Sequence, residues 1–493
     1  MIMPLALILC SAGLYCFSFP DLLFLQGVPL LSGGCALPFL FALEGRRAPT
    51  RFLLGLVWGL VANGLVTAWL IPVSVGGWGA FTCALAWQGG VFGLLFPSRL
   101  SMRALVLIPS AWVFSEFIRA LALGGFTWSI GYALAPVPAL IQPAAFGGVY
   151  ALAAAVLGVN TIIFLRLKGI LKTRGFVFLA VALGMLVCVP GAWMMMSSGR
   201  QGPPEARVAA VQANISPEQK LRDELYDVNA GRHVALTQRG AVEGRLGPQD
   251  LVVWPETAFV DDVLSDARWR GRLEALARGL QVNMLVGSAL LVEGKDLNSA
   301  VFLGFDGRWG PVYNKRHLVP FTEFTPAGAE RVAASMGIGK YHFTAGQGPG
   351  AMPLPDGKVF RVAICSEEFY PGLFRPAAAF SVVMLNDGWF TLPQALWLHA
   401  LAAPLRAVES GASLVRVANT GVTAAFDAHG RRTGEALGPG RPGVAVYDVS
   451  PAGMRTFYAK WGDVFAMMCG LFVIMERSIR LARRPRPRIP RDG

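Results

Sequence analysis

Long apolar segments fill most of the first 197 residues of this chain, and they restrict its possible folds more than any other feature. The hydrocarbon core of a bilayer is about 30 Å thick, so a helix needs about 20 apolar residues to cross it. Eight segments meet this description, near residues 2–19, 22–43, 52–71, 78–97, 104–123, 139–165, 175–196 and 461–480. Hydrophobic residues make up 54% of the 493 residues and charged residues only 15%, unlike an average soluble protein. We therefore expect a membrane α-helical bundle of about eight transmembrane helices.

The basic residues predict the orientation of this bundle. The formal net charge of +13 would suit a nucleic-acid-binding protein, but Lys and Arg gather in short clusters beside the apolar segments. These clusters occupy alternate loops, at 44–51, 98–103 and 166–174, and the tail after residue 475. Because cytoplasmic loops carry the excess of Lys and Arg, we expect both termini in the cytoplasm and no nucleic-acid partner. In a Gram-negative bacterium the chain would cross the inner (cytoplasmic) membrane several times.

This topology divides the chain into three parts. Residues 1–197 are expected to form a transmembrane bundle of seven helices, and residues 198–455 an external, periplasmic domain. Residues 456–493 are expected to hold the last transmembrane helix and a basic cytoplasmic tail. The middle part has a different character from the two others, because it is more polar and its apolar runs are short.

The external domain has the pattern of a layered α/β fold. Short β-rich runs recur along it, at 208–211, 251–254, 284–287, 300–303, 361–364, 382–385 and 414–417. Helical stretches at 217–244 and 262–279 lie between some of them. Continuous apolar runs indicate strands that are buried on both faces, as in sheets covered by other layers.

One cysteine differs from the other six. Cys365 lies in the external domain, whereas the others fall within predicted spans, where a thiol is a small hydrophobic group. The periplasm is oxidising, and Cys365 has no partner in this domain for a disulfide. An unpaired external cysteine is either buried packing or a reactive thiol.

Three of the predicted strands are followed by ionisable or nucleophilic residues, in the order Glu256, Lys315 and Cys365. Open α/β sheets place their sites at strand ends, so these side chains are candidates for one site. The five histidines lack the spacing of metal ligands, so we expect neither a metal nor a cofactor. A Cys–His arrangement with His317 or His399 remains an alternative at this point.

At these residues the sequence resembles the apolipoprotein N-acyltransferase family, the membrane members of the nitrilase (carbon–nitrogen hydrolase) superfamily. The matching motifs are WPE at 254–256, YNKRHLVPFTEF at 313–324, ICSE at 364–367, NDGWF at 386–390, RAVE at 406–409 and NTGVT at 419–423. The block at 313–324 is the most diagnostic. The resemblance extends over essentially the whole chain.

The resemblance implies a four-layer αββα nitrilase-like domain with a catalytic triad of Glu256, Lys315 and Cys365. It also implies that Glu323 and Glu367 support the triad. Three positions depart from the family pattern and concern substrate contacts rather than the triad. They are Leu221 and Ser366, where an aromatic residue is usual, and Pro404, where an Arg is common.

The chemistry of acyl transfer assigns a role to each member of the triad. Glu256 would take the proton of Cys365 during attack, because a thiol with a pKa near 8.5 is mostly neutral at pH 7. Lys315 would donate to the oxyanion of the tetrahedral intermediate, with the backbone N–H of Ser366 as the second donor. The acidic pair Glu367 and Glu368 requires a nearby cation, for which Lys315 is the best candidate in the sequence.

The resemblance implies two substrates, a phospholipid acyl donor and a diacylated lipoprotein whose N-terminal amine is the acceptor. Two other functions remain open from the residues. A membrane-tethered amidase or nitrilase would use the same triad but release the acyl group to water. A transporter or receptor would need no nucleophile; Glu116 and Arg119 are the ionisable residues that stand out within the spans, and we expect them to pair.

The segment 388–404 is a candidate for substrate access. It holds Trp389, Phe390 and Trp397 among several leucines, which suits either a buried core helix or an arm on the outer membrane leaflet. The glycine-bearing loop 326–350 is a candidate for a mobile flap.

Overall fold

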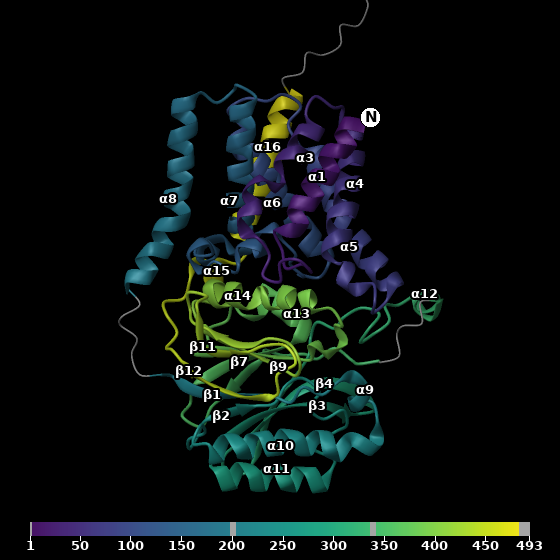
Figure 1. Cartoon of the computed structure of the whole chain (residues 1–493), viewed down its shortest axis with the longest axis vertical. Coiled ribbons are helices and arrows are strands. Elements are labelled where there is room, and N and C mark those ends of the chain that lie inside the picture. The colour runs from purple at the N-terminus through teal and green to yellow at the C-terminus, as the bar shows by residue number, and fades with distance from the viewer. Residues whose placement is uncertain (1, 198–203, 336–341, 483–493) are drawn as a thin grey trace, which may run out of the picture.

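The computed structural model describes residues 2–197, 204–335 and 342–482, and the statements below refer to these residues. A helical bundle forms one end of the molecule and a domain of two sheets forms the other (Figure 1). The C-terminal helix α16 (Val464–Ala482) returns from the domain into the bundle, where it packs against α6 and α7.

The long helices of the bundle are α1 (Ile2–Phe17), α4 (Ala48–Val66), α5 (Val75–Leu95), α6 (Ala104–Ala122), α7 (Ala144–Leu167) and α8 (Thr173–Ser197). Helices α4 and α5 approach each other closely because glycines face each other between them. A Cβ built on Gly55 would lie 2.0 Å from the carbonyl oxygen of Gly89, so no other residue fits there. Small residues at such contacts let membrane helices pack backbone to backbone.

The segment 22–43 is not the single spanning helix that its apolar composition predicts. It begins as an irregular loop and continues as η1 (Pro29–Leu31), α2 (Ser32–Cys35) and α3 (Leu37–Leu43). Proline interrupts the helical hydrogen bonds here, since Pro29 and Pro38 each stand at the start of a short helix. Among the described residues, four helices are long and apolar enough to cross a membrane, namely Ala48–Val66, Ala104–Ala122, Ala144–Leu167 and Thr173–Ala192. The expected count of eight spans is therefore not confirmed.

The other end of the molecule is built from two six-stranded sheets. The first has the order β12 (Gly443–Val449), β1 (Ala206–Gln212), β2 (Leu251–Val253), β3 (Asn283–Val292), β4 (Lys295–Leu303) and β5 (Trp309–Asn314). The second has the order β11 (Arg432–Leu437), β10 (Thr423–Phe426), β9 (Ser413–Ala418), β8 (Phe380–Leu385), β7 (Val359–Ile364) and β6 (Ala351–Pro353). Every residue of β8 is buried, as its continuous apolar run predicts.

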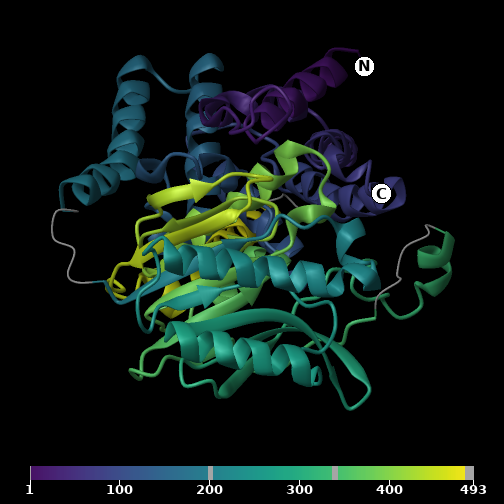
Figure 2. The ribbon, with the colours of Figure 1, turned by 60° about the horizontal axis from the view of Figure 1, so that its bottom comes forward.

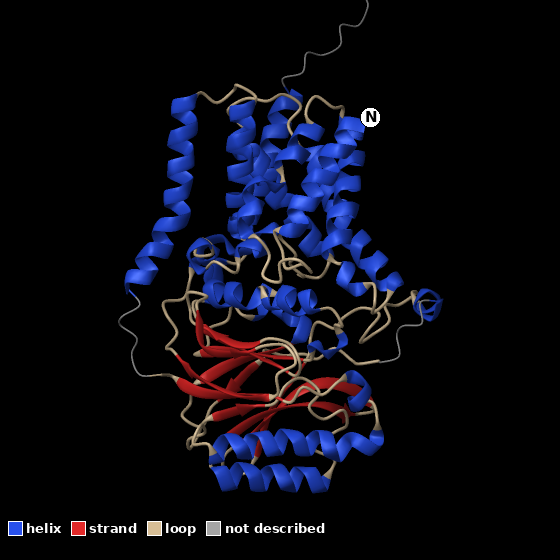
Figure 3. Ribbon diagram, viewed as in Figure 1, coloured by secondary structure: helices blue, strands red, loops and turns tan. Residues whose placement is uncertain are grey.

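Helices cover the outer face of each sheet. Helices α10 (Tyr226–Val242) and α11 (Ala267–Leu280) lie side by side across the first sheet, as Figure 2 shows from the turned view. Helices α13 (Pro393–Ala400) and α14 (Ala402–Ser410) cover the second sheet and separate it from the bundle (Figure 3). The two sheets face each other across a buried apolar core. The expected αββα sandwich is confirmed.

Helix α11 shows how the sequence produces one of these layers. The carboxylate of Asp266 caps the helix by accepting hydrogen bonds from the amides of Arg268 and Trp269. The buried residues Trp269, Leu273, Leu276 and Ala277 recur at helical spacing and face the sheet. The exposed face carries the charged residues of the helix.

Helices α13 and α14 belong to both halves of the molecule. Leu398, Leu401 and Leu405 are buried in the core of the bundle, whereas Ala403 and Ala407 pack against the second sheet. For residues 393–404 this burial favours the core-helix interpretation over an arm lying on the membrane, and the access role of segment 388–404 stays a prediction. These helices are a shared layer, because apolar faces on both sides must be buried.

Candidate active site

The side chains of Glu256, Lys315 and Cys365 follow β2, β5 and β7, strands that come from both sheets. The structure brings Glu256 and Lys315 into contact, with 3.4 Å between Oε1 of Glu256 and Nζ of Lys315. The charges of both residues act on the thiol of Cys365. The three residues that the sequence proposed therefore share one site at the ends of the strands.

Hydrogen bonds to both of its oxygens orient the carboxylate of Glu256. Its Oε1 accepts a hydrogen bond from Nδ2 of Asn298 at 2.8 Å, and its Oε2 accepts one from the backbone amide of Asn386 at 2.9 Å. Asn298 also donates to Oε1 of Glu323 at 3.0 Å, so one amide group ties the two acids together. The NDGWF motif pointed to Asn386, whereas no sequence pattern marked Asn298.

The ammonium of Lys315 lies between two carboxylates. Its Nζ is 2.8 Å from Glu323 and 3.4 Å from Glu256, and its side chain is only 1% exposed. Burial alone would lower the pKa of Lys315, but the charges of Glu323 and Glu256 outweigh this and raise it well above its ordinary value. Lys315 therefore stays protonated at neutral pH and offers a fixed positive charge.

The nucleophile candidate Cys365 begins a short turn in a strained conformation. Its φ of 55° lies in the left-handed region that residues with a side chain rarely adopt. The turn is η6 (Cys365–Phe369), which follows β7 directly. Burial and the nearby Glu256 raise the pKa of the Cys365 thiol well above its ordinary value, although Lys315 opposes them. The resting thiol is therefore neutral and requires a base for attack.

Strained backbone conformations gather around this site. Thr257, next to Glu256, has φ 48°, and Phe321, two residues before Glu323, has φ 64°. Such conformations persist only where the surrounding structure holds them, and they are frequent at active sites.

Lys220 holds one of these conformations. Its ammonium donates to the carbonyl oxygens of Glu256 and Thr257, at 3.2 and 2.8 Å. Burial lowers the pKa of Lys220 to about 7. The sequence singled out its neighbour Leu221, which is exposed.

Glu367 connects the lysine loop to the nucleophile turn. Its buried carboxylate accepts hydrogen bonds from the backbone amides of Ile364, Arg316 and His317 at 2.7–3.1 Å. The hydroxyl of Tyr313 donates to the same carboxylate at 2.8 Å. Glu367 thus fixes the positions of both Lys315 and Cys365 through the backbone that carries them.

The cation that contacts Glu368 is Arg416 on β9, and not Lys315 as the sequence suggested. The guanidinium of Arg416 bridges Glu368 at 3.2 Å and Asp387 at 2.9 Å, and all three side chains are fully buried. Arg416 and then His399 lower the pKa of Asp387 to about 2, against the effect of burial, which raises it. Arg416 is distant in sequence from both acids, and its position in an apolar strand gave no indication of this role.

The histidines take part in other interactions. His399 places Nδ1 2.7 Å from Oδ1 of Asp387 and stacks on Phe369, while the ring of His317 stacks on Tyr370. Burial lowers the pKa of His317. Among the described residues neither imidazole hydrogen-bonds to Cys365, whereas the charge of Glu256 acts on the Cys365 thiol, which favours Glu256 as its partner.

The remaining candidates differ in their exposure and contacts. Ser366 is partly buried, and its hydroxyl has no hydrogen-bond partner among the described residues. Trp389 is 41% exposed, and Phe390 contacts Trp69 of the bundle edge-on, with 4.7 Å between ring centroids. Trp397 on α13 is half-buried, and Pro404 on α14 is buried. In the proposed flap, residues 336–341, with Gly337 and Gly339, lie outside the described residues.

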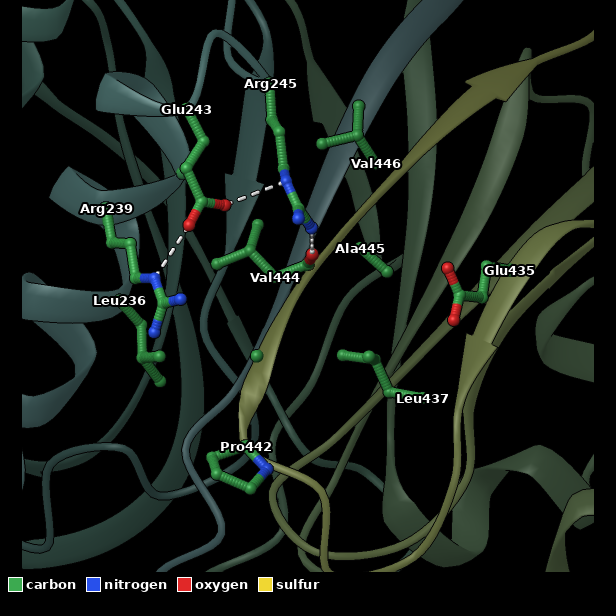
Figure 4. Close-up of a pocket in the computed structure, with 12 residues that line it drawn as sticks. Leu236, Arg239, Glu243, Arg245, Glu435, Leu437, Pro442, Val444, Ala445 and Val446 are labelled. Carbon is green, nitrogen blue, oxygen red and sulfur yellow. Dashed lines mark hydrogen bonds and ion pairs between the residues drawn. The ribbon is translucent and has the colours of Figure 1, made fainter.

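A separate hollow of about 480 Å³ lies between α10 and the strands β11 and β12 (Figure 4). Its two arginines, Arg239 and Arg245, both pair with Glu243, and Arg245 also donates to the carbonyl oxygen of Val444. None of the candidate catalytic residues lines it. This hollow is therefore not part of the site described above.

The αββα sandwich and its strand-end site define a protein of the carbon–nitrogen hydrolase class, and a model of this family, described as "Carbon-nitrogen hydrolase", matches residues 207–459. A second model, described as "Apolipoprotein N-acyltransferase N-terminal domain", matches residues 11–162. The apolipoprotein N-acyltransferase of Geobacter metallireducens is 30% identical, covering 95% of this chain and 94% of its own. The chain therefore belongs to the apolipoprotein N-acyltransferase family, and it is a membrane acyltransferase.

A second relative and a solved structure are also similar to this chain. The apolipoprotein N-acyltransferase of Bradyrhizobium diazoefficiens is 30% identical, over 85% of this chain and 81% of its own. Among solved structures, the Nesterenkonia AN1 amidase from the nitrilase superfamily covers 54% of this chain and 97% of its own. It shares 16% identity at a TM-score of 0.39. The family assignment rests on the sequence matches.

Proposed function

We propose that this protein transfers an acyl chain from a membrane phospholipid to the α-amine of S-diacylglyceryl-cysteine at the N-terminus of a lipoprotein. The observation that carries the proposal is the buried pair of Glu256 and Lys315, with 3.4 Å between Oε1 and Nζ, next to the Cys365 thiol on which both charges act. This pair supplies a proton acceptor and a fixed cation, the two groups that covalent acyl transfer requires. Membership of the apolipoprotein N-acyltransferase family supports a phospholipid as the acyl donor and a lipoprotein as the acceptor.

In the first step, Sγ of Cys365 attacks the ester carbonyl carbon while Glu256 takes the thiol proton. The carbonyl oxygen becomes an oxyanion, which accepts hydrogen bonds from Lys315 and from the backbone N–H of Ser366. The intermediate collapses by breaking the bond to the glycerol oxygen, which receives the proton from Glu256. A thioester on Cys365 and a lysophospholipid result.

In the second step, the lipoprotein amine attacks the thioester carbon and Glu256 takes a proton from the amine. The same donors stabilise the second oxyanion. The bond to Sγ then breaks, the thiol recovers its proton, and an amide remains on the lipoprotein. Exclusion of water would favour the amine over hydrolysis.

The proposed location is the bacterial inner membrane, with the catalytic domain in the periplasm. The basic loops support this topology, because they lie at the end of the bundle opposite the two sheets (Figure 1). Two ion pairs hold these loops at that end of the bundle. Lys168 pairs with Glu44 of another basic loop, and Arg103 pairs with Glu476 of α16. The basic tail from residue 483 onward lies outside the described residues.

The function is tested by asking whether the acyl chain goes to a peptide amine or to water. The purified protein receives a phospholipid with a labelled acyl chain, with and without a synthetic peptide that begins with S-diacylglyceryl-cysteine. We expect the label to reach the peptide amine and to stay on the protein when the peptide is absent. Rapid release of free fatty acid in both samples would contradict the proposal and indicate a membrane-tethered amidase or nitrilase.

The variant Glu256→Gln separates the proposed base from a simple charge effect. Thioester formation is expected to slow by about 10²–10⁴-fold, because no group takes the thiol proton. Since the charge of Glu256 raises the pKa of Cys365, its removal should lower the pH midpoint of Cys365 alkylation by iodoacetamide. Normal acylation in this variant would assign the base role to another group, with His317 the next candidate.

Lipid access provides a further prediction. We propose that the acyl chain approaches past Trp389 and past Phe390, which touches Trp69 of the bundle. Trp389→Asp is expected to slow acylation by phospholipid in bilayers about tenfold or more, with Trp389→Phe near normal. Thiol reactivity toward a small water-soluble reagent and the melting temperature should be unchanged in both. A joint loss of reactivity and stability in Trp389→Asp would place the access route elsewhere.

A further inference from the structure

The nucleophile turn is held from outside its own domain. A loop of the bundle between α6 and η3 (Ile130–Leu134) reaches the last residue of η6. Both the backbone amide and the hydroxyl of Thr127 donate hydrogen bonds to the carbonyl oxygen of Phe369, at 2.9 and 2.8 Å. Tyr132 places its hydroxyl 2.7 Å from Oγ1 of Thr127 and so donates to it. A single carbonyl at the end of the turn is thereby fixed by the bundle.

Aromatic packing reinforces this contact. The ring of Phe369 lies 5.4 Å from Phe126, 6.1 Å from Trp128 and 5.6 Å from Tyr132, measured between ring centroids. His399 of the catalytic domain stacks on the same ring, with 5.5 Å between ring centroids. Phe369 is only 6% exposed and is part of the core of the bundle. The nucleophile turn therefore ends inside the bundle.

A buried carboxylate fixes the bundle side of this contact. Glu116 on α6 accepts hydrogen bonds from the hydroxyl of Ser129 at 2.6 Å and from the amide of Ile130 at 3.2 Å. Nε1 of Trp112 donates to the same carboxylate. Arg119 donates instead to Gln88, and no ion pair within 4 Å joins Arg119 to Glu116 among the described residues. The two residues thus form no direct ion pair in the described part of the chain, and Glu116 instead holds the loop that carries Thr127.

Three consecutive residues of the turn are anchored to three different places. Glu367 is bonded to the lysine loop, Glu368 to Arg416, and Phe369 to Thr127. The first two anchors belong to the catalytic domain and the third to the bundle. A strained residue such as Cys365 keeps its conformation only when its surroundings determine it, so each anchor bears on where the thiol lies.

We propose that Thr127 is a positioning residue for the nucleophile, so that the bundle is part of the catalytic scaffold as well as the membrane anchor. Loss of the hydroxyl contact leaves only the Thr127 amide on this carbonyl, which loosens the end of η6 and lets Cys365 leave its strained conformation more often. The thiol then lies less often in line with Lys315 and Glu256. The inference rests on the proposed role of Cys365 as the nucleophile.

The test compares Thr127→Val with Thr161→Val in the full-length protein. Both variants remove one buried threonine hydroxyl, but the hydroxyl of Thr161 on α7 donates to Leu157 within its own helix. Acylation of Cys365 by a water-soluble p-nitrophenyl ester is measured in single turnovers. Thr127→Val should lower the maximal rate about tenfold without changing the half-saturating ester concentration, Thr127→Ser should restore it, and Thr161→Val should match the unaltered protein.

Hydrogen exchange at the amides of residues 366–369 separates this proposal from the function proposed above. Exchange should rise about tenfold in Thr127→Val and stay unchanged in Thr161→Val. Equal acylation rates in the two variants, or faster exchange with an unchanged rate, would overturn the positioning role. If the unaltered protein forms no acyl-Cys365, the proposed function fails, and unchanged exchange in Thr127→Val would refute the bundle anchor as well.

Discussion

Replacing Cys365 by alanine is expected to abolish both the acyl-enzyme and the transfer reaction while the protein stays folded in the membrane. The change removes a single sulfur atom, and alanine has the same Cβ, so the strain at the positive φ is unaltered. No other thiol can take its place, because the remaining six cysteines lie in the membrane bundle or its C-terminal helix. Transfer to a diacylglyceryl-cysteine peptide and the melting temperature are the two measurements.

Two further variants complete this experiment. Cys365→Ser replaces the thiol by a hydroxyl, which is a much weaker acid. This variant should form an acyl ester on Ser slowly, or should fail to pass the acyl chain on to the peptide. Cys469→Ala removes a partly buried thiol from α16 and should leave transfer unchanged. Normal transfer by Cys365→Ala would show that the nucleophile assignment is wrong.

The second large effect is expected at Lys315. The variant Lys315→Met should slow acylation by 10²–10³-fold or more, of the order seen when an oxyanion donor is lost. It should also destabilise the protein by about 3–5 kcal/mol, because Glu256 and Glu323 are left buried without their shared cation. Lys315→Arg should not restore the rate, since a planar guanidinium does not replace a compact ammonium.

A second substitution distinguishes these two consequences. The double variant Lys315→Met/Glu323→Gln removes one of the two facing charges and should recover much of the lost melting temperature. Its acylation rate should stay as low as that of Lys315→Met, because the oxyanion still lacks its cation. If the rate recovered together with stability, Lys315 would have a structural role and the oxyanion would be stabilised by other groups.

The sequence predicted those parts of the fold that depend on local patterns. Buried strands appear as continuous apolar runs, and β8 is an example. The sequence predicts the membrane spans less well, because apolar composition does not show where a helix is interrupted. Segment 22–43 carries no charged residue, yet its prolines and the loop before Pro29 divide it into short helices.

The candidate site shows the same limit. Glu256, Lys315 and Cys365 could be predicted because they follow strands and carry a recognised motif. Asn298 and Arg416 could not, since their function depends on which strands become neighbours. The sequence suggested Lys315 as the cation that contacts Glu368. In the structure this cation is Arg416, which lies on β9.

The interface between the two halves was the hardest feature to predict. Segment 388–404 has the composition of a membrane-surface arm, but its apolar residues are shared between the bundle and the second sheet. Thr127 lies in an ordinary loop sequence, and its contact with Phe369 spans 242 positions. Contacts at such separation leave no periodic pattern in the chain.

Intact mass spectrometry of the purified protein after exposure to phospholipid tests the central claim most directly. We expect the mass to rise by one acyl chain, peptide mapping to place it on Cys365, and hydroxylamine to remove it, as for a thioester. Addition of the diacylglyceryl-cysteine peptide should return the protein to its original mass and leave the acyl chain on the peptide amine. Full transfer to the peptide without any acylated protein, or a stable adduct on another residue, would contradict the account.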